Sequence, residues 1–395
     1  MRLHLLVHGL PVGGTEVLVA QLARRYRREG LDVTVGCLDE IGELGHELMA
    51  EGVSVELYSR RAGFDALLAA RIARSVSRHR VDILHAHQYT PYFYGMLVKT
   101  LTSVPLIFTE HGRLYPDLPS SRRRTFNRIF APFVDRITAV SEEVRDSLWQ
   151  VEGIAPARVE IVRNGVDLDR FARRGPEDRR IARASLSLAA ETQVIGTVGR
   201  LDPVKNYPLL LAAFRRLRER CRDATLLIIG DGPERGRLES LARDLGLGMH
   251  VRFLGMRRDV DRVLPALDVF VLSSLSEGMP VTLIEAMAAS VPVVCSAVGG
   301  IPKVVEDGLE GLLVPGIPPD PRTSPEPVVS EYVERFAATV GRVLVEPGLG
   351  RALAERAAKR ARAEFSLESM AASYRRLYDE ALDWSAAVRR ALAIG

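Results

Sequence analysis

Apolar and polar residues follow two alternating patterns along most of the chain. Short runs rich in Val, Ile and Leu are followed by longer segments in which apolar residues recur every three or four positions. The short runs are typical of buried strands, and the longer spacing is typical of amphipathic helices. Strands that alternate with helices predict parallel sheets covered by helices on both faces, so the expected fold class is α/β.

The pattern occurs twice, which predicts two doubly wound domains. A first helix is expected from about Gly14 to Glu29. The strands expected in the first half are Leu3–Val7, Asp32–Cys37, Val53–Tyr58, Asp82–Ala86, Pro105–Thr109 and Arg136–Val140. Those expected in the second half are Gln193–Val198, Thr225–Ile229, Val251–Leu254, Asp268–Leu272, Pro292–Ser296 and Gly311–Val314.

The segments outside these two repeats predict a hinge and a terminal helix. Residues 164–188 are rich in Arg and contain the breaker pair Gly175-Pro176, so the hinge is expected there. The segment Ser366–Ala393 predicts a C-terminal helix with one apolar stripe that needs a partner surface. That stripe consists of Met370, Tyr374, Leu377, Tyr378, Ala381 and Trp384. The expected domain boundaries are 1–170, 171–365 and 366–395.

Composition narrows the class of protein. A length of 395 residues fits two or three domains at roughly 100–200 residues each. The 47% hydrophobic and 26% charged residues are typical of soluble globular proteins, and a net charge of +4 is too small to indicate nucleic-acid binding. Cys37, Cys221 and Cys295 lie too far apart for a disulfide framework or a zinc site, which favours a cytoplasmic location. No segment approaches ~18 apolar residues, so any membrane contact is expected to be peripheral.

The strongest chemical signal follows the expected strand Asp268–Leu272. There a turn with Gly and Pro leads into a helix expected at Thr282–Ala289, and the N–H groups of a helix start can hold an anion or a sugar hydroxyl. Glu277 precedes this helix and Glu285 lies within it, and carboxylates suit the hydroxyls of a polyol. The alternative is that Glu277 caps the helix and Glu285 is solvated. However, the neighbours of Glu285 are apolar, and an unpaired carboxylate among them would be costly.

A second signal stands at the end of the strand Gln193–Val198. Gly199 and Arg200 follow this strand directly, and Lys205 comes five positions later. Ligands of open α/β sheets bind beyond the carboxyl ends of the strands, where two cations can hold both phosphates of a nucleotide diphosphate. The alternative reading is a pair of solvated surface cations.

Two weaker signals lie in the first half. Gly13 and Gly14 form a turn that lets the backbone approach a phosphate closely, although a plain strand-to-helix turn has comparable weight. His111 ends the strand Pro105–Thr109 and is a candidate for sugar contact, although a lone His is more often structural. His85 and His87 lack a nearby carboxylate for a metal site and are expected to line a cleft.

Taken in order, these segments resemble the GT-B glycosyltransferases of glycosyltransferase family four across essentially the whole chain. The shared motifs are Gly13-Gly14-Thr15-Glu16, His111-Gly112, Asn164-Gly165-Val166-Asp167, Gly199-Arg200-Leu201 with Lys205-Asn206, Gly230-Asp231-Gly232-Pro233, Phe253-Leu254-Gly255, and Glu277 with Glu285. Each motif is common alone, but their order and spacing are specific. One departure is Lys303, at a position where family members often carry Glu.

The resemblance implies two Rossmann-like domains facing a central cleft, with a C-terminal helix packing back. Residues 1–170 would form the N-terminal acceptor-side domain, and residues 171–365 would form the C-terminal nucleotide-sugar-binding domain. The helical segment 366–395 would return to the N-terminal domain.

The resemblance also implies a role for each matching residue. His111, Arg200, Lys205 and Glu277 would be catalytic. The donor-binding residues would be Gly13, Gly14, Asn164, Gly199, Gly230, Arg257, Gly278, Met279, Pro280, Val281, Thr282 and Glu285. No cofactor and no metal ion would be needed, because no Asp-x-Asp motif stands at a strand end and two cations can neutralise the diphosphate.

The implied activity is that of a retaining hexosyltransferase that uses a nucleotide diphosphate sugar, with UDP favoured over GDP. The partners would be this donor and a glycan, glycolipid or small-molecule acceptor in glycoconjugate biosynthesis, and no nucleic acid. Two alternatives stay open. One is a non-catalytic nucleotide-sugar-binding protein, and the other is a GT-B synthase or phosphorylase with a soluble small-molecule acceptor.

A basic segment after His111 adds a hypothesis about membranes. Arginines alternate with apolar residues from Arg113 to Phe130, a pattern that suits anionic lipid. This hypothesis places the enzyme at the inner face of the membrane as a peripheral protein. The alternative is a solvated loop and helix whose apolar residues pack inward.

Overall fold

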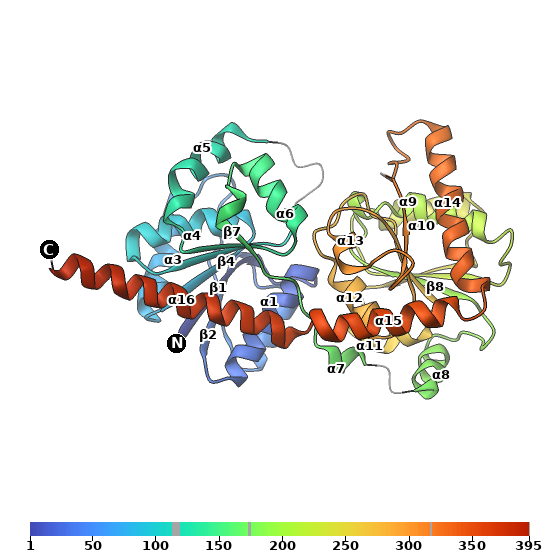
Figure 1. Cartoon of the computed structure of the whole chain (residues 1–395), viewed down its shortest axis with the longest axis horizontal. Coiled ribbons are helices and arrows are strands. Elements are labelled where there is room, and N and C mark those ends of the chain that lie inside the picture. Colours follow the sequence, from blue (N-terminus) through green and yellow to red (C-terminus); the bar gives the residue numbers. More distant parts are fainter. Residues whose placement is uncertain (113–118, 173–174, 317, 395) are drawn as a thin grey trace. The chain divides into compact units, whose positions relative to one another are not determined.

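A computed structural model describes residues 1–112, 119–172, 175–316 and 318–394 (Figure 1). Contacts divide the chain into two compact units. Unit 1 combines Met1–Gly165 with the C-terminal residues from Leu367 onward, and unit 2 is Val166–Ser366. This boundary lies before the expected one, which followed residue 170. The reason is that the Val166 N–H donates to the Phe365 carbonyl at 3.0 Å, and the short helix Leu168–Phe171 packs within unit 2.

Unit 1 contains a parallel sheet of seven strands in the order β3-β2-β1-β4-β5-β6-β7. The strands are β1 Arg2–Gly9, β2 Asp32–Glu40, β3 Ser54–Leu57, β4 Ile83–His87, β5 Leu106–Glu110, β6 Arg136–Ala139 and β7 Val159–Ile161. The first six strands were expected, whereas β7 is an edge strand of three residues, too short for a recognisable pattern. The strand order reverses between β1 and β4.

The helices of unit 1 cover this sheet. They are α1 Gly14–Arg28, α2 Gly42–Ala50, α3 Ala66–Arg78, α4 Tyr89–Thr102, α5 Ser121–Phe130, α6 Glu142–Ser147 and α16 Leu367–Ile394, with the short turns η1 Ala131–Phe133, η2 Leu148–Glu152 and η3 Pro156–Arg158. Polar caps mark several helix starts: the Ser141 side chain, for example, accepts from the Val144 N–H and starts α6 directly after β6.

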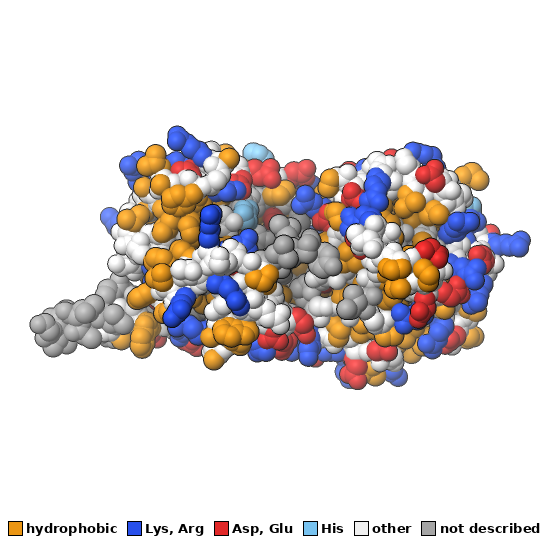
Figure 2. Space-filling model, turned by 90° about the horizontal axis from the view of Figure 1, so that it is seen from above, with side chains coloured by type: hydrophobic (Ala, Val, Ile, Leu, Met, Phe, Trp, Pro, Cys, Tyr) orange, Lys and Arg blue, Asp and Glu red, His pale blue; other side chains and the backbone are white. Residues whose placement is uncertain are grey.

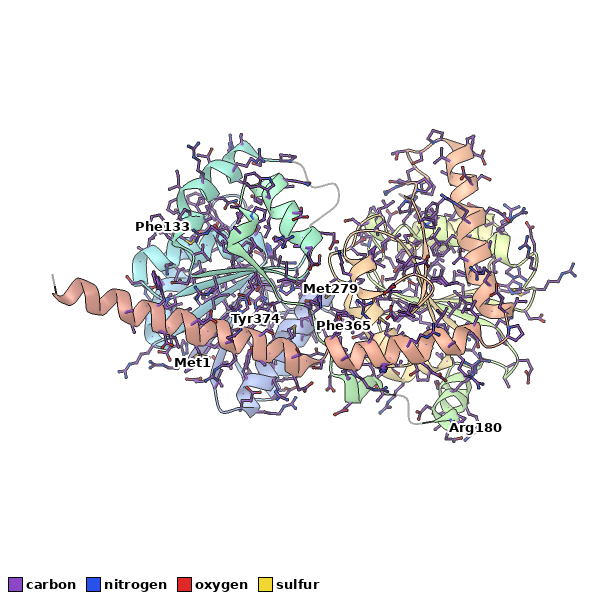
Figure 3. The ribbon with its side chains drawn as sticks, in the orientation of Figure 1. Met1, Phe133, Arg180, Met279, Phe365 and Tyr374 are labelled. Carbon is purple, nitrogen blue, oxygen red and sulfur yellow. The ribbon has the colours of Figure 1, made fainter. Side chains whose placement is uncertain are left out.

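The C-terminal helix α16 is part of unit 1 and lies against it (Figure 1). It buries most of the expected apolar stripe. The Tyr26 hydroxyl of α1 donates to the Ala371 carbonyl at 2.8 Å, and Tyr374 is fully buried (Figure 3). Tyr378 bonds to His85 of β4 through its hydroxyl at 2.7 Å. The expectation was wrong for Trp384, which is 62% exposed because the contacts of the stripe end near Ala381.

Unit 2 contains a parallel sheet of six strands in the order β10-β9-β8-β11-β12-β13. The strands are β8 Val194–Val198, β9 Thr225–Ile229, β10 Val251–Gly255, β11 Val269–Leu272, β12 Val293–Ser296 and β13 Leu312–Val314. All six were expected. The order reverses between β8 and β11, which are direct neighbours.

The helices of unit 2 complete its core. They are α7 Leu168–Phe171, α8 Pro176–Ser185, α9 Tyr207–Leu217, α10 Arg235–Asp244, α11 Val260–Val263, α12 Val281–Ala288, α13 Ile301–Val304, α14 Glu326–Val345 and α15 Leu349–Glu364, with the turns η4 Pro203–Lys205 and η5 Leu264–Ala266. Buried side chains of α9 and α14 pack with the strands in one hydrophobic cluster. The expected α/β architecture of two parallel sheets with helices is confirmed.

Candidate functional site

The residues expected to carry chemistry in unit 2 follow the two strands at which the strand order reverses. Gly199 and Arg200 come directly after β8, and residues 273–277 come directly after β11. The two strands pair in parallel, with Val269 opposite Ile195, so their carboxyl ends lie at the same edge of the sheet. Such a reversal is where ligands bind in doubly wound sheets, because the loops on either side diverge and leave a crevice.

An ion pair joins the two loops at this edge. The Lys205 Nζ atom donates to Glu277 Oε1 at 2.7 Å, and the two side chains are 21% and 9% exposed, respectively. The structure thus brings together two residues that were both expected at the site. Partial burial strengthens their interaction relative to a surface pair.

The position of Glu277 is fixed by its main chain as well. Its carbonyl accepts from the Gly300 N–H at 3.1 Å. Gly299 has φ +50° and lies so close that a Cβ atom there would stand 1.9 Å from the Glu277 oxygen. Only glycine can be accommodated at this distance. The turn after β12 therefore packs directly against the backbone of Glu277.

Arg200 stands at the same edge as an exposed side chain. Its guanidinium makes no hydrogen bond or ion pair with any described residue. The neighbouring backbone is tightly packed: the Gly199 carbonyl accepts from the Tyr207 hydroxyl at 3.1 Å, and a Cβ at Gly230 would lie 2.0 Å from the same oxygen. Gly199 and Gly230 therefore act through close backbone packing, and Arg200 is available to an anion.

The turn between Glu277 and α12 supplies backbone donors. No side chain of the described residues caps the helix, which begins at Val281 after Pro280, so N–H groups of its first turn are available to ligand oxygens. The expected helix start, Thr282, differs by one residue. Met279, labelled in Figure 3, is buried and Gly278 is half-buried, which fits a turn packed against the unit.

Glu285 lies within α12 and is 8% exposed. Burial raises its pKa from 4.5 to about 7, and the nearby Arg170 partly offsets this shift. The Arg170 guanidinium is itself held by Asp261 Oδ1 at 2.8 Å and by the Arg258 carbonyl at 2.6 Å. Burial thus disfavours the ionised carboxylate of Glu285. Hydrogen bonds from ligand hydroxyl groups would stabilise that ionised form.

Arg257 has a partner of its own. Its Nε and Nη2 atoms donate to the two carboxylate oxygens of Asp259 at 2.8 and 2.6 Å. The guanidinium is therefore held in one orientation beside the end of β10, and its expected contact with a donor stays a prediction.

In unit 1, the structure brings together two further candidates, His111 and Asn164. Both are buried, and burial lowers the pKa of His111 from 6.5 to about 4, while the Asn164 side chain opposes this shift. Nε2 of His111 lies 2.8 Å from His87 Nδ1. His111 is thus neutral near pH 7 and suits hydrogen bonding rather than contact with an anion as a cation.

His85 and His87 do not have the surroundings expected of them. Both are fully buried, whereas residues that line a cleft are in part exposed. His85 lies 2.7 Å from both the Tyr378 hydroxyl and the Thr109 hydroxyl. The expectation was wrong because these contacts come from α16 and β5, which the local sequence around β4 does not reveal.

Gly13 and Gly14 lie at the reversal point of the unit 1 sheet. Gly13 precedes α1, and Gly14 is the first residue of that helix. A Cβ at Gly13 would stand 2.3 Å from Glu16 Oε2, so the carboxylate lies against the backbone at this position. The turn is as compact as expected, and its role in binding stays a prediction.

The basic segment is held mainly by contacts within unit 1. Arg113, Leu114 and Tyr115 lie outside the described residues, but α5 is described. Arg123 donates to Glu152 at 3.1 Å and Arg124 donates to the Gln150 carbonyl at 3.0 Å, while the rings of Phe126 and Phe130 pack together with centroids 4.6 Å apart.

Exposed apolar side chains occur on α5 and on the turn η1 that follows it. Ile129 is 54% exposed and Phe133, labelled in Figure 3, is 64% exposed. Figure 2 shows Lys and Arg interspersed with Asp and Glu over the visible face of the molecule.

Three features of the site were not expected from the sequence. Ser274 donates to Glu277 at 2.6 Å, Arg170 lies near Glu285, and His87 contacts His111. Ser274 stands three residues before Glu277, where its hydroxyl offered a weak signal. The other two contacts depend on the tertiary fold.

Two kinds of feature are absent from the described part of the chain, a metal site and a membrane-spanning helix. It contains no group of three or more His, Cys, Asp or Glu side chains arranged to hold a metal ion. None of its helices is both long enough and apolar enough to cross a membrane.

The arrangement in unit 2 suits one kind of ligand. Arg200 and Lys205 offer positive charge to phosphates, and Glu277 and Glu285 offer acceptor oxygens to hydroxyl groups. A molecule with a diphosphate and two polyol portions has this combination of groups.

Two family models match the chain. Residues 12–170 match the model described as Glycosyltransferase Family 4, and residues 178–320 match the model described as Glycosyl transferases group 1. The D-inositol 3-phosphate glycosyltransferase of Actinosynnema mirum is 31% identical, over 92% of this chain and 92% of the relative. That of Mycobacterium marinum is 29% identical, over 92% of this chain and 81% of the relative.

Solved structures show the same fold at lower sequence identity. The glycosyltransferase of Rickettsia africae has a TM-score of 0.81 at 20% identity and covers 96% of this chain and 98% of its own. Anabaena Alr3699/HepE, in complex with UDP and glucose, has a TM-score of 0.81 at 22% identity, with 95% and 98% covered. The chain therefore belongs to the GT-B glycosyltransferases of glycosyltransferase family four.

Proposed function

We propose that the chain is a retaining hexosyltransferase that moves a sugar from a nucleotide diphosphate sugar to a hydroxyl acceptor in glycan or glycolipid biosynthesis. The observation that supports this proposal most is the ion pair of Lys205 and Glu277 beside the exposed Arg200, at the strand reversal of unit 2. Cations for a diphosphate and a carboxylate for sugar hydroxyls meet there at one edge.

Each residue has a distinct part in the proposed reaction. Arg200 and Lys205 bind the diphosphate and stabilise the negative charge that grows on the leaving nucleotide. Glu277 and the N–H groups that start α12 hold the sugar hydroxyls, and Glu285 accepts hydrogen bonds from the ribose. In unit 1, neutral His111 is assigned a hydrogen bond to the donor sugar.

Similar proteins suggest the donor and a second acceptor class. Anabaena HepE was solved with UDP-glucose, which supports testing UDP donors before GDP donors. The curated relatives are named as D-inositol 3-phosphate glycosyltransferases. The second candidate function is therefore transfer to a soluble, small-molecule polyol, which is distinguished from the first by assaying inositol phosphates beside glycan and glycolipid acceptors.

The donor is identified by thermal shift. A ligand at 100 times its Kd stabilises the folded state by about 2.7 kcal/mol, enough for a clear rise in Tm. We expect a UDP-sugar to raise the Tm more than the matching GDP-sugar. A larger rise with GDP-sugars would change the assigned donor, and no rise with any nucleotide sugar would contradict donor binding.

The reaction is expected to retain the configuration of the donor anomeric carbon. The family resemblance is to retaining enzymes, which supports this expectation. Nuclear magnetic resonance of the product formed from an α-linked donor measures the outcome directly. An α-linked product is expected, and a β-linked product would disprove retention.

Turnover is expected to be independent of divalent cations. Arg200 and Lys205 can supply the positive charge that a metal ion gives to the diphosphate in other transferases. Activity should stay unchanged after exhaustive chelation with EDTA. If chelation abolished activity and only magnesium or manganese restored it, the role given to the two cations would be wrong.

Binding to anionic membranes is proposed through exposed residues of α5. Arg122 and Arg128 are exposed and make no hydrogen bond or ion pair with the described residues, and Ile129 lies beside them. Each basic residue near an anionic surface contributes about 1 kcal/mol. Changing both arginines to Glu should therefore abolish co-sedimentation with anionic liposomes at low salt.

Neutral liposomes and the variant Arg351→Glu, at an exposed position on α15, are the controls. Equal sedimentation of wild type with neutral and anionic liposomes would contradict the role given to the two arginines, and no sedimentation with either would favour a soluble acceptor.

A further inference from the structure

The carboxylate of Glu277 is held at one oxygen by two donors. Oε1 accepts from Lys205 Nζ at 2.7 Å and from Ser274 Oγ at 2.6 Å. Oε2 accepts no hydrogen bond from any described residue. One oxygen of Glu277 therefore anchors the side chain, and the other is available to a ligand.

The proposed donor would compete with Glu277 for Lys205. A diphosphate is a stronger partner for an ammonium group than a single carboxylate, because it carries more negative charge. When Lys205 turns towards the diphosphate, Glu277 loses its cationic partner while its side chain is only 9% exposed. A carboxylate in such surroundings needs another donor to remain ionised and oriented.

Ser274 is placed to be that donor. Ser274 follows β11 and is fully buried, so water does not compete with Glu277 for its hydroxyl group. The residues on both sides tie its segment to the loop of Lys205. The Ser273 hydroxyl donates to the Lys205 carbonyl at 3.0 Å, and the Leu275 N–H donates to the Val204 carbonyl at 2.8 Å. Removing the Ser274 hydroxyl therefore leaves the backbone of the site in place.

We propose that Ser274 is a positioning residue that keeps Glu277 directed at the donor sugar after Lys205 has moved to the diphosphate. The proposal rests on the proposed function. It predicts that removing the Ser274 hydroxyl weakens the interaction with the transferred sugar and leaves binding of the nucleotide unchanged. A purely structural role for Ser274 would affect both alike.

Ser274→Ala separates these two roles. Because a hydrogen bond to a charged group is lost, kcat/KM for the sugar donor should fall roughly ten- to hundredfold. The Kd of UDP alone, measured by calorimetry, should stay within about twofold of wild type, because UDP lacks the transferred sugar that Glu277 would hold and Lys205 is intact. Ser274→Thr keeps a hydroxyl and should recover most of the lost kcat/KM.

Ser296→Ala is the matched control. Ser296 is fully buried at the end of β12, and its Oγ meets no partner in good hydrogen-bond geometry within the described chain. This variant should match wild type in both measurements.

The outcomes distinguish the inference from the proposed function. Wild-type kcat/KM in Ser274→Ala, or an equal loss of UDP affinity and of kcat/KM, would overturn the role of Ser274. Wild-type protein that turns over neither UDP nor GDP sugars would instead overturn the proposed function.

Discussion

Lys205→Ala is expected to lower kcat by about 10²- to 10³-fold while changing the KM for the donor much less. Negative charge on the leaving diphosphate is greater in the transition state than in the bound donor, so a fixed cation stabilises the transition state more. Lys205 is held near this position before any ligand arrives, through its 2.7 Å contact with Glu277. Once Lys205 has turned to the bound diphosphate, it is in place before the bond breaks and costs little reorganisation during the chemical step.

Steady-state kinetics with the donor varied measures both parameters. Lys359→Ala removes an exposed lysine from α15 of the same unit and should leave kcat and KM unchanged. If Lys205→Ala raised KM with little change in kcat, Lys205 would act in ground-state binding, and the role assigned to it here would belong to another residue.

Glu285→Gln is expected to stabilise the folded protein and to weaken donor binding. Burial raises the pKa of Glu285 from 4.5 to about 7, so between these values the folded state keeps a proton that the unfolded state has lost. The free energy of unfolding therefore falls as pH rises from 4.5 to about 7 and stays lower above that pH. Removing the ionisable group should raise the free energy of unfolding by up to about 3 kcal/mol at pH 8 and leave it unchanged below pH 4.5.

Urea unfolding of Glu285→Gln and wild type at pH 8 and at the lowest pH at which both fold tests this expectation. The donor KM of the variant should rise about ten- to hundredfold, because a charged acceptor for the ribose hydroxyls is lost. In wild type, the donor KM should fall as pH rises through about 7. Glu355→Gln, an exposed change on α15, is the control and should alter neither quantity.

A stability gain at pH 8 with an unchanged KM would mean that Glu285 is buried but does not contact the donor. The loss of stability in Glu285→Gln at pH 8 would contradict the burial argument.

The regular elements were largely predictable because each strand is a local pattern. All strands of unit 2 and all but β7 of unit 1 correspond to short β-branched runs, since parallel strands are buried on both faces. The boundary between the units was less predictable, because it depends on where residues 166–171 pack. The end of the buried stripe on α16 likewise depends on the size of the surface it covers, and Trp384 lies beyond it.

In the candidate site, the residues were predictable from the sequence and their contacts were not. Glu277, Lys205 and Arg200 were identifiable because charged residues after strand ends carry a local signature. Their mutual geometry was not, since the contact between Lys205 and Glu277 spans 72 positions and requires β8 and β11 to be neighbours. The burial of His85 required the fold of α16 and β5, which no pattern around β4 encodes.

Transfer of sugar by this chain from a nucleotide diphosphate sugar is tested by turnover of such a donor. Purified protein is incubated with UDP-glucose and, separately, with other UDP and GDP sugars, each with glycan, glycolipid and inositol phosphate acceptors. Release of the nucleotide and the mass of the product are followed over time. We expect many product molecules per protein molecule with at least one donor, and loss of that activity in Lys205→Ala. Stoichiometric binding of the donor without release or transfer, under conditions in which the donor raises the Tm, would contradict this expectation and identify a nucleotide-sugar-binding protein instead.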